Sequence, residues 1–490
     1  MMKLKNFGEV FTVAVIFAAM FLFFSQVHPI TPFDGDDWNV ISDARPALPK
    51  WGGWNPIKVL PETFYPICGY IAAYAVKPII GDYLSAITIT AALILSLFIA
   101  AYILLFIEFV KKIFRVDSLL ANLTGIIFLL LHFSMFHRHN AQDNIYLFHT
   151  IDANCYFNYV IPNILNAALV LLIAQFDITK NIFDRVTPRS AALFFALYLG
   201  IFSNILNSSL LGIYVFIELL SRVEWKNFKL KTFWGENKSL CVILIFWLIS
   251  LLFEANGGRA KNFTADGVDY FANVIQTAAA FFNSPNHDHG LRLLIFSIVT
   301  VIFILTRRGD SEQKIFLKVV AKFAACIPFL AVYTILVAAR ADMNYATRSD
   351  VQFGLFFCVM IIFCATLLYW LKKFPRAAFI LPILCFALFT WIFSGKRSYS
   401  PSTFGNVPEQ ICAEISRSII DQIVAADRAG LDKVTVAVPK GDDVDNWPHP
   451  LYMGKNISRT LCNHGIISRR IEVTFVPDVR LNARYALPTQ

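Results

Sequence analysis

Long apolar runs separated by short polar segments recur along most of the chain. Runs of roughly 18–25 apolar residues are typical of membrane helices, because about 20 residues are needed to cross the hydrocarbon core. We predict eleven spans, at residues 10–27, 85–110, 119–136, 159–176, 191–203, 209–220, 239–254, 291–305, 319–339, 352–371 and 377–394. The pattern therefore predicts an all-α polytopic membrane protein with about eleven transmembrane helices.

Two apolar segments are harder to assign to a span. Thr63–Ile80 is apolar enough to cross, but it contains Pro66, Gly69 and Pro78, which favour a helix in the interface or a broken re-entrant segment. Residues 191–220 are interrupted by the polar stretch Ser203–Ser209. We therefore expect two short helices with a tight turn there, rather than one long helix.

The pattern changes after Phe393. An apolar stripe at helical spacing runs through Asn406–Gly430, and Lys433–Pro439 and Arg470–Pro477 alternate in the manner of strands. The stretch between these strands that contains residues 453–465 predicts a second helix. We expect a membrane domain at residues 1–395 and a small α/β domain at residues 396–490.

The charge distribution predicts how the spans are oriented. The net charge is +9 and the mean hydropathy is +0.57. With the N-terminus in the cytoplasm, the inner segments hold 20 Lys and Arg in 67 residues, whereas the outer segments hold 9 in 131. This follows the positive-inside rule, so the basic balance indicates topology and not nucleic-acid binding. The large loops 28–84, 137–158 and 255–290 and the C-terminal domain then lie outside the membrane.

The first run, residues 10–27, also has the features of a signal peptide, but no small-residue cleavage pattern follows it. We expect it to be retained as a membrane helix.

Acidic and aromatic residues concentrate in the first outer loop. Asp36 and Asp37 follow the first span directly, and Trp38, Trp51 and Trp54 follow them. Acids at a helix end are often only solvated charges, and indoles at a membrane surface are often anchors. Indole faces beside carboxylates are also typical of carbohydrate sites, where a carboxylate can serve as the general base that deprotonates a sugar hydroxyl.

Cations in the outer segments are candidates for stabilising a leaving phosphate. They are Arg259, Lys261, Arg340 and Arg348. The sequence contains no Gly-rich phosphate loop, Walker motif or dinucleotide fingerprint. An enzyme acting on the outer face would therefore take its sugar from a lipid phosphate.

Histidines in two outer loops raise the question of a metal. They lie at residues 137–149 and 287–289 without a zinc-ligand spacing, so we assign no metal ligands and no cofactor, although a divalent cation stays possible. Asn140 and Asp143 are candidates for sugar binding instead. Cys412 and Cys462 either form a disulfide or are buried free thiols.

Three short stretches resemble a known family of enzymes. They are "DGDDW" after the first span, "WGGWNPIKVLPE" after it, and "NWPHPLYMGKNISRTLCNHGIISRRI" in the tail. The order of parts resembles the GT-C class of polytopic glycosyltransferases, and more narrowly the Gtr-type O-antigen glucosyltransferases of bacterial serotype conversion.

The resemblance implies an inner-membrane enzyme with a periplasmic active site. It would transfer a hexose, typically glucose, with inversion from undecaprenyl phosphate to O-antigen repeat units of lipopolysaccharide. It implies Asp36 or Asp37 as the base, Glu62 as a supporting acid, and Arg259 as a ligand of the donor phosphate with Arg45 and Lys58 as helpers. An O-antigen polymerase and a flippase of lipid-linked sugars are the alternatives.

Overall fold

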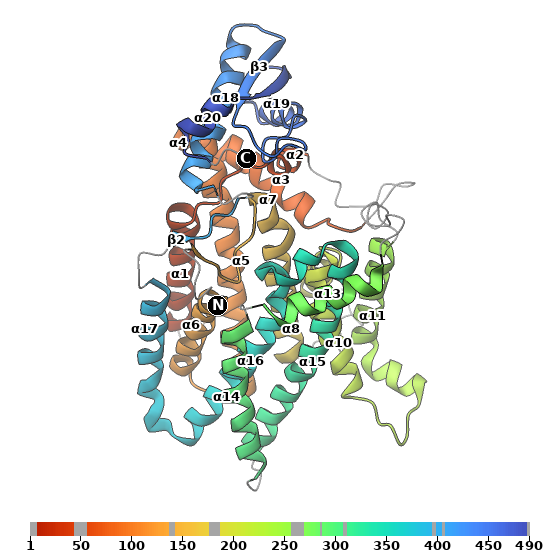
Figure 1. The fold of residues 1–490 in the computed structure, drawn as a ribbon. Coiled ribbons are helices and arrows are strands. Elements are labelled where there is room, and N and C mark those ends of the chain that lie inside the picture. The colour runs from red at the N-terminus through yellow and green to blue at the C-terminus, as the bar shows by residue number, and fades with distance from the viewer. Residues whose placement is uncertain are drawn as a thin grey trace.

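The computed structural model describes residues 7–43, 56–136, 143–175, 187–255, 269–284, 287–306, 311–393, 398–403 and 407–487, and most of these residues are helical (Figure 1). The helices of the first half are α1 (Phe7–Leu22), α2 (Gly35–Val40), α3 (Pro61–Ile71), α4 (Lys77–Ile80), α5 (Tyr83–Phe114), α6 (Ser118–Ser134), α7 (Ala153–Cys155), α8 (Ile161–Gln175), α9 (Pro188–Ile201) and α10 (Ile205–Leu220). Those of the second half are α11 (Leu230–Ala255), α13 (Tyr270–Phe282), α14 (His287–Leu305), α15 (Ser311–Ala341), α16 (Ser349–Lys373), α17 (Ile380–Phe393), α18 (Glu409–Arg428), α19 (Met453–Asn463) and α20 (Val479–Arg484).

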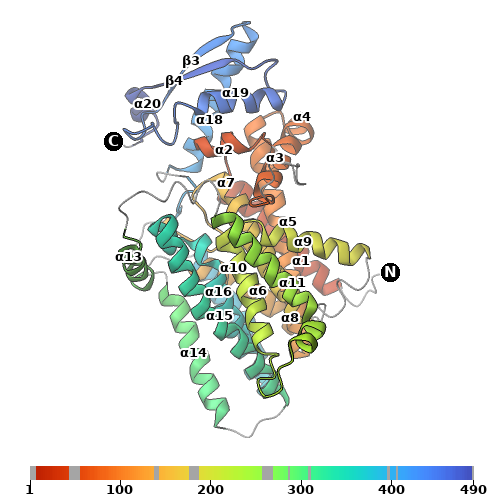
Figure 2. The ribbon, with the colours of Figure 1, turned by 90° about the vertical axis from the view of Figure 1, so that its right-hand side faces the viewer.

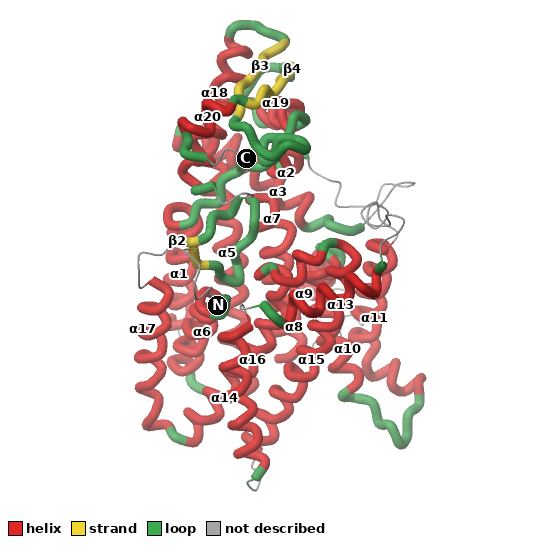
Figure 3. Tube along the Cα trace, in the orientation of Figure 1, coloured by secondary structure: helices red, strands yellow, loops and turns green. Residues whose placement is uncertain are grey.

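Short irregular turns and four strands complete the described chain. The π-helical turns are η2 (Phe23–Val27), η3 (Ala72–Val76) and η4 (Tyr156–Val160), and the 3₁₀ turns are η6 (Met343–Thr347) and η7 (Pro375–Phe379). The strands are β1 (Asp143–Asn144), β2 (Ser398–Tyr399), β3 (Lys433–Val438) and β4 (Glu472–Pro477), and they occupy little of the molecule (Figure 3).

The membrane-type helices form a bundle. In the part of the chain that the structure describes, eight helical segments are long and apolar enough to cross a membrane, so the protein is a multi-pass membrane protein. Helices α6, α9 and α10 are apolar but shorter, so the count of eleven spans stays a prediction. In an 18-residue window of the segment Met343–Lys373, 83% of the residues are buried, and this segment forms the centre of the bundle. In Pro375–Ile392 only 6% of the residues are buried, and this segment lies at the edge (Figure 1).

The two ambiguous apolar segments are resolved by local structure. Helices α9 and α10 are separate, as expected, and the break between them is shorter than the polar stretch. Asn204 caps α10, because its side chain accepts a hydrogen bond of 2.9 Å from the backbone N of Leu206. The segment Thr63–Ile80 lies in α3, η3 and α4 and is not among the candidate spans. The predicted outer loop at 255–290 is also not all loop, because it contains α13.

The C-terminal residues form the helices and strands that their pattern predicts. Strand β3 pairs with β4 in parallel, from Lys433 opposite Glu472 to Val438 opposite Pro477, and α18 and α19 pack on this pair (Figure 2). A second, shorter parallel pair joins β1 to β2. All nine cysteines are free, so Cys412 and Cys462 form no disulfide.

Helix α19 lies against α2, which contains the acidic motif (Figure 2). The Thr460 hydroxyl donates to the Trp38 carbonyl over 3.1 Å and lies 2.9 Å from the Ser42 hydroxyl. The Gly35 backbone N donates to the Pro448 carbonyl over 3.1 Å. The C-terminal elements therefore fix the position of the first loop's acids.

Candidate functional site

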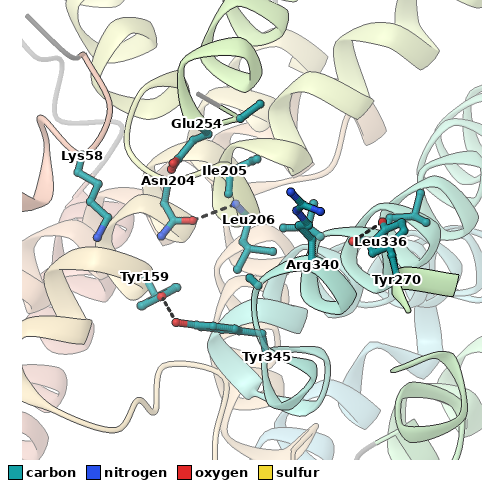
Figure 4. A pocket seen from close by; sticks show the side chains of 13 residues that line it. Lys58, Tyr159, Asn204, Ile205, Leu206, Glu254, Tyr270, Leu336, Arg340 and Tyr345 are labelled. Carbon is teal, nitrogen blue, oxygen red and sulfur yellow. Dashed lines mark hydrogen bonds between the residues drawn. The ribbon is translucent and has the colours of Figure 1, made fainter. Parts of the chain in front are cut away.

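A cavity of about 600 Å³ lies where several helix ends meet. Its walls come from η4, the start of α10, the end of α11, α13, the end of α15, η6 and the residue Lys58 before α3 (Figure 4). The lining is mainly apolar and aromatic, and its charged side chains are Lys58, Glu254 and Arg340. Each lining residue lies in or at the border of a segment that the charge pattern places outside, so one end of the bundle forms the whole cavity.

Three tyrosines hold the walls of this cavity together (Figure 4). The Tyr159 hydroxyl lies 3.4 Å from the Tyr345 hydroxyl, which joins η4 to η6. The Tyr270 hydroxyl donates to the Leu336 carbonyl over 2.9 Å, which joins α13 to α15. The other face of α13 exposes Phe271 and Phe282, as in a helix that lies in a membrane interface. The cavity therefore borders the region where lipid headgroups would lie.

Two predicted phosphate ligands line the cavity. Lys58 adopts a left-handed backbone conformation with φ of 63°, and its backbone N donates to the Phe202 carbonyl over 2.7 Å. Arg340 is exposed near the end of α15. In Figure 4 their side chains lie on opposite sides of Asn204. Two cations over an apolar lining suit a ligand that joins a phosphate to a hydrocarbon chain.

Arg348 does not line the cavity, because its guanidinium is held elsewhere. It donates to both carboxylate oxygens of Asp350, over 3.0 Å from Nε and 2.5 Å from Nη2. Its guanidinium carbon lies 4.6 Å from the ring centre of Tyr159 and 4.9 Å from that of Tyr345. In this structure Arg348 supports the two rings that line the cavity, and its role as a phosphate ligand stays a prediction.

Asp37 is a structural residue of the first loop. Its side chain is 1% exposed, and it accepts hydrogen bonds from the backbone N of Phe33, Asp34 and Asn154 over 2.8, 3.1 and 2.7 Å. With Asp34 it forms a capping box at the start of α2. Burial, followed by the charge of Asp152, raises the pKa of Asp37. In this structure Asp37 therefore holds the loop together, and its role as the base stays a prediction.

Asp36 is exposed, in contrast to its neighbour. It lies close enough to Asp152 and Tyr452 for its charge to contribute to raising the pKa of both groups, in addition to the effect of their burial. Asp152 caps α7 and is buried, and its pKa is raised to about 6. The positive charge of Arg348 acts in the opposite direction and lowers the pKa of Asp152. Asp36, Asp152 and Arg348 therefore interact electrostatically in series. Asp36 is the exposed member, and Arg348 is the member that contacts the tyrosine rings of the cavity.

The other predicted side chains of the first loops have different positions. Trp38 is 0% exposed, because the hydrophobic effect places it in the core below α19, and its role in sugar binding stays a prediction. Glu62 is half-buried in the first turn of α3 and is not among the described cavity-lining residues. The backbone of Asp143 pairs with Ser398 in the short sheet. The remaining candidates lie outside the described residues: Arg45, Trp51, Trp54, Asn140, Arg259 and Lys261.

Sequence reasoning missed several residues that build the site. Tyr159 and Asn204 lie at the borders of apolar runs, and Tyr345 lies in the short loop between two runs; at such positions a tyrosine or an asparagine has no distinctive pattern. Asp152 carried a usable signal, because it is an acid in a predicted outer loop that directly precedes the candidate membrane span Ala153–Gln175. A carboxylate at the border of a membrane helix costs free energy, so its presence there indicates that it caps the helix or takes part in catalysis.

Three described histidines form hydrogen bonds that join parts of the fold. His28 and His149 both contact the Ser400 carbonyl, over 3.0 and 2.9 Å, and His287 lies 3.2 Å from the Gln352 amide oxygen. Within the described ranges, no three His, Cys, Asp or Glu side chains lie together as a metal site requires.

Comparisons of the chain with protein-family models, with curated proteins and with solved structures find no match. The case for a function therefore rests on the geometry of the cavity and of the acidic loop.

Proposed function

We propose that the protein is a membrane glycosyltransferase that takes a hexose from a polyprenyl phosphate and transfers it to a polysaccharide. The observation that carries the proposal is the cavity in which Lys58 and Arg340 accompany an apolar and aromatic lining. A lipid-linked sugar phosphate has the same division into a charged group and an apolar chain. The resemblance of the acidic motif extends the proposal to glucose, undecaprenyl phosphate and O-antigen on the periplasmic face.

In this reaction, Lys58 and Arg340 hold the donor phosphate and stabilise the charge that grows on it as its bond to the anomeric carbon breaks. An acceptor hydroxyl attacks that carbon from the opposite face, and a carboxylate takes its proton. Asp36 is the exposed acid of the motif and is assigned this role. Inversion needs one base and no covalent intermediate on the enzyme.

The test is transfer of label from radiolabelled undecaprenyl-phosphate-glucose to O-antigen lipopolysaccharide by purified protein in detergent. We expect Arg340→Gln and Lys58→Gln each to lower the rate by on the order of 10- to 100-fold, since a charged hydrogen bond contributes about 1.5–3 kcal/mol. We expect Asp36→Asn to lower it by about 10²- to 10⁴-fold, the usual contribution of a general base.

Arg428→Gln is the matched control, because Arg428 is an exposed arginine at the end of α18, remote in sequence from the cavity segments. It should transfer as the wild type does. Wild-type rates in all three site variants would remove the cavity and Asp36 from the mechanism. If the wild type transfers no label but moves the lipid-linked sugar across a liposome bilayer, the protein is a flippase and the proposal fails.

A further inference from the structure

A second cavity, of about 420 Å³ and with a more polar lining than the first, lies at the opposite end of the bundle from the proposed active site. The ends of α5, α8 and α10 and the first half of α15 form its walls. The charge pattern places all of these segments on the cytoplasmic side. An adjoining hollow of about 900 Å³ shares four of its residues, Glu218, Arg222, Lys318 and Lys322, so the two form one open region.

Positive charge dominates the described lining of this second cavity. Five cations line it, Lys112, Arg115, Arg222, Lys318 and Lys322, against the single carboxylate of Glu218. Glu218 is already engaged, because it accepts hydrogen bonds from Lys322 and from Nε of Arg222, the latter over 2.9 Å. Among the described residues, the side chains of Arg115 and Lys318 form no ion pair with a carboxylate. The cavity thus has cationic groups in excess.

Cations at cytoplasmic helix ends are expected in any membrane protein, so their number alone does not indicate a ligand. The second observation is Gln175 at the end of α8. Its side chain is 5% exposed and lines the cavity, yet neither its amide oxygen nor its amide nitrogen has a hydrogen-bond partner in the described structure. A buried amide without partners costs free energy, and a bound polar group would remove that cost.

We propose that this cavity binds a phosphate group on the cytoplasmic side, with Arg115 and Lys318 as charge partners and Gln175 as a hydrogen-bonding partner. Phosphate fits because its oxygens accept several hydrogen bonds at once from guanidinium, ammonium and amide donors. The site is distinct from the outer cavity and does not depend on the proposed transferase activity. The phosphate comes either from the headgroup of an anionic lipid or from a soluble phosphate.

The test measures the thermal unfolding midpoint of the full chain in nanodiscs. One arm replaces part of the phosphatidylcholine by phosphatidylglycerol, and the other adds inorganic phosphate to phosphatidylcholine nanodiscs, with potassium chloride matching the ionic strength. A ligand that binds only the folded state raises the midpoint. A rise in the first arm alone identifies a lipid headgroup, a rise in the second alone identifies a soluble phosphate, and a rise in both identifies the shared group.

The decisive variant is Arg115→Gln with Lys318→Gln, which should lose most of the wild-type rise. Its matched control is Lys229→Gln with Lys231→Gln, which removes two exposed cations from the same predicted side but outside the cavity lining, and which should keep the rise. A third variant, Gln175→Leu, should unfold at a higher temperature without phosphate and should show a smaller rise with it. No rise in the wild type, or an equal rise in the cavity and control variants, overturns the proposal.

Discussion

Asp36 and Asp37 are adjacent in the chain and differ in what surrounds them. Asp37 points inward and accepts three backbone hydrogen bonds, and Asp36 stays exposed. The difference arises because α2 begins at Gly35, which makes Asp37 the third residue of the helix. At that position its side chain reaches back and accepts a hydrogen bond from the backbone N of the capping residue Asp34. The sequence identifies the acidic motif but does not distinguish the two carboxylates, since both follow the first span at nearly the same distance.

Asp152 makes the stability of the protein depend on pH. Its pKa is raised to about 6 because it is buried beside other carboxylates, so the folded state binds its proton more tightly than the unfolded chain does. The stabilisation is fully present below the unfolded pKa of about 3.9 and is lost as the pH rises through about 6. Holding this carboxylate ionised at neutral pH costs on the order of 2–3 kcal/mol.

We therefore expect Asp152→Asn to unfold at a higher temperature than the wild type at pH 7, and the difference to shrink as the pH falls to 5. The asparagine oxygen can still accept the capping hydrogen bond from the Cys155 backbone N. Asp443→Asn changes an exposed carboxylate and should follow the wild-type curve. Thermal unfolding in detergent across this pH range is the measurement, and parallel curves for wild type and Asp152→Asn would contradict the shift.

At the scale of elements, the approach of α10 to α11 depends on one glycine. A Cβ on Gly212 would lie 2.2 Å from ring carbon Cδ2 of Trp247, far inside van der Waals contact. Small residues at such positions let membrane helices pack closely. The position matters for the site because Glu254 and Ala255, at the end of α11, line the outer cavity.

We expect Gly212→Ala to destabilise the protein by about 1–3 kcal/mol, the usual cost of overpacking a close contact. Gly235→Ala is the matched control, because a Cβ at Gly235 meets no atom within 4 Å and alanine favours the helix. It should leave the unfolding temperature unchanged or raise it slightly. Equal unfolding temperatures for the two variants would show that the contact with Trp247 relaxes without cost.

At the scale of the whole molecule, the C-terminal elements hold the acidic loop in place through contacts between residues that are 384 to 422 positions apart in the sequence. Thr460, Arg459 and Ser416 reach backbone carbonyls of the first loop, at Trp38, Asn39 and Pro32 respectively, over 3.1, 2.7 and 3.0 Å. The conformation of the first loop around α2 thus depends on contacts with α18 and α19.

Thr460→Val tests this dependence, because it keeps the shape of the side chain and removes its hydroxyl. The change leaves the Ser42 hydroxyl without this buried partner and should cost about 1–3 kcal/mol. Amide hydrogen exchange should accelerate in residues 33–43 and stay unchanged in α5. Thr435→Val, at an exposed position of β3, is the control. Unchanged exchange in residues 33–43 would mean that the loop holds its conformation without α19.

The sequence by itself determined the elements that depend on local pattern. Apolar runs located the membrane helices, the polar stretch near Asn204 located the break between α9 and α10, and the alternation after residue 430 located β3 and β4. These features are set by hydrophobic period and by local capping, which act between residues close in the chain.

Only the tertiary structure decided which side chains meet. Burial removed Trp38 from the surface, the ion pair with Asp350 occupied Arg348, and helix packing brought Lys58 to the same cavity as Arg340. The unpartnered amide of Gln175 also became visible only in the packed bundle. Such contacts join residues hundreds of positions apart, and their energies depend on burial and direction, which no local pattern of residues specifies.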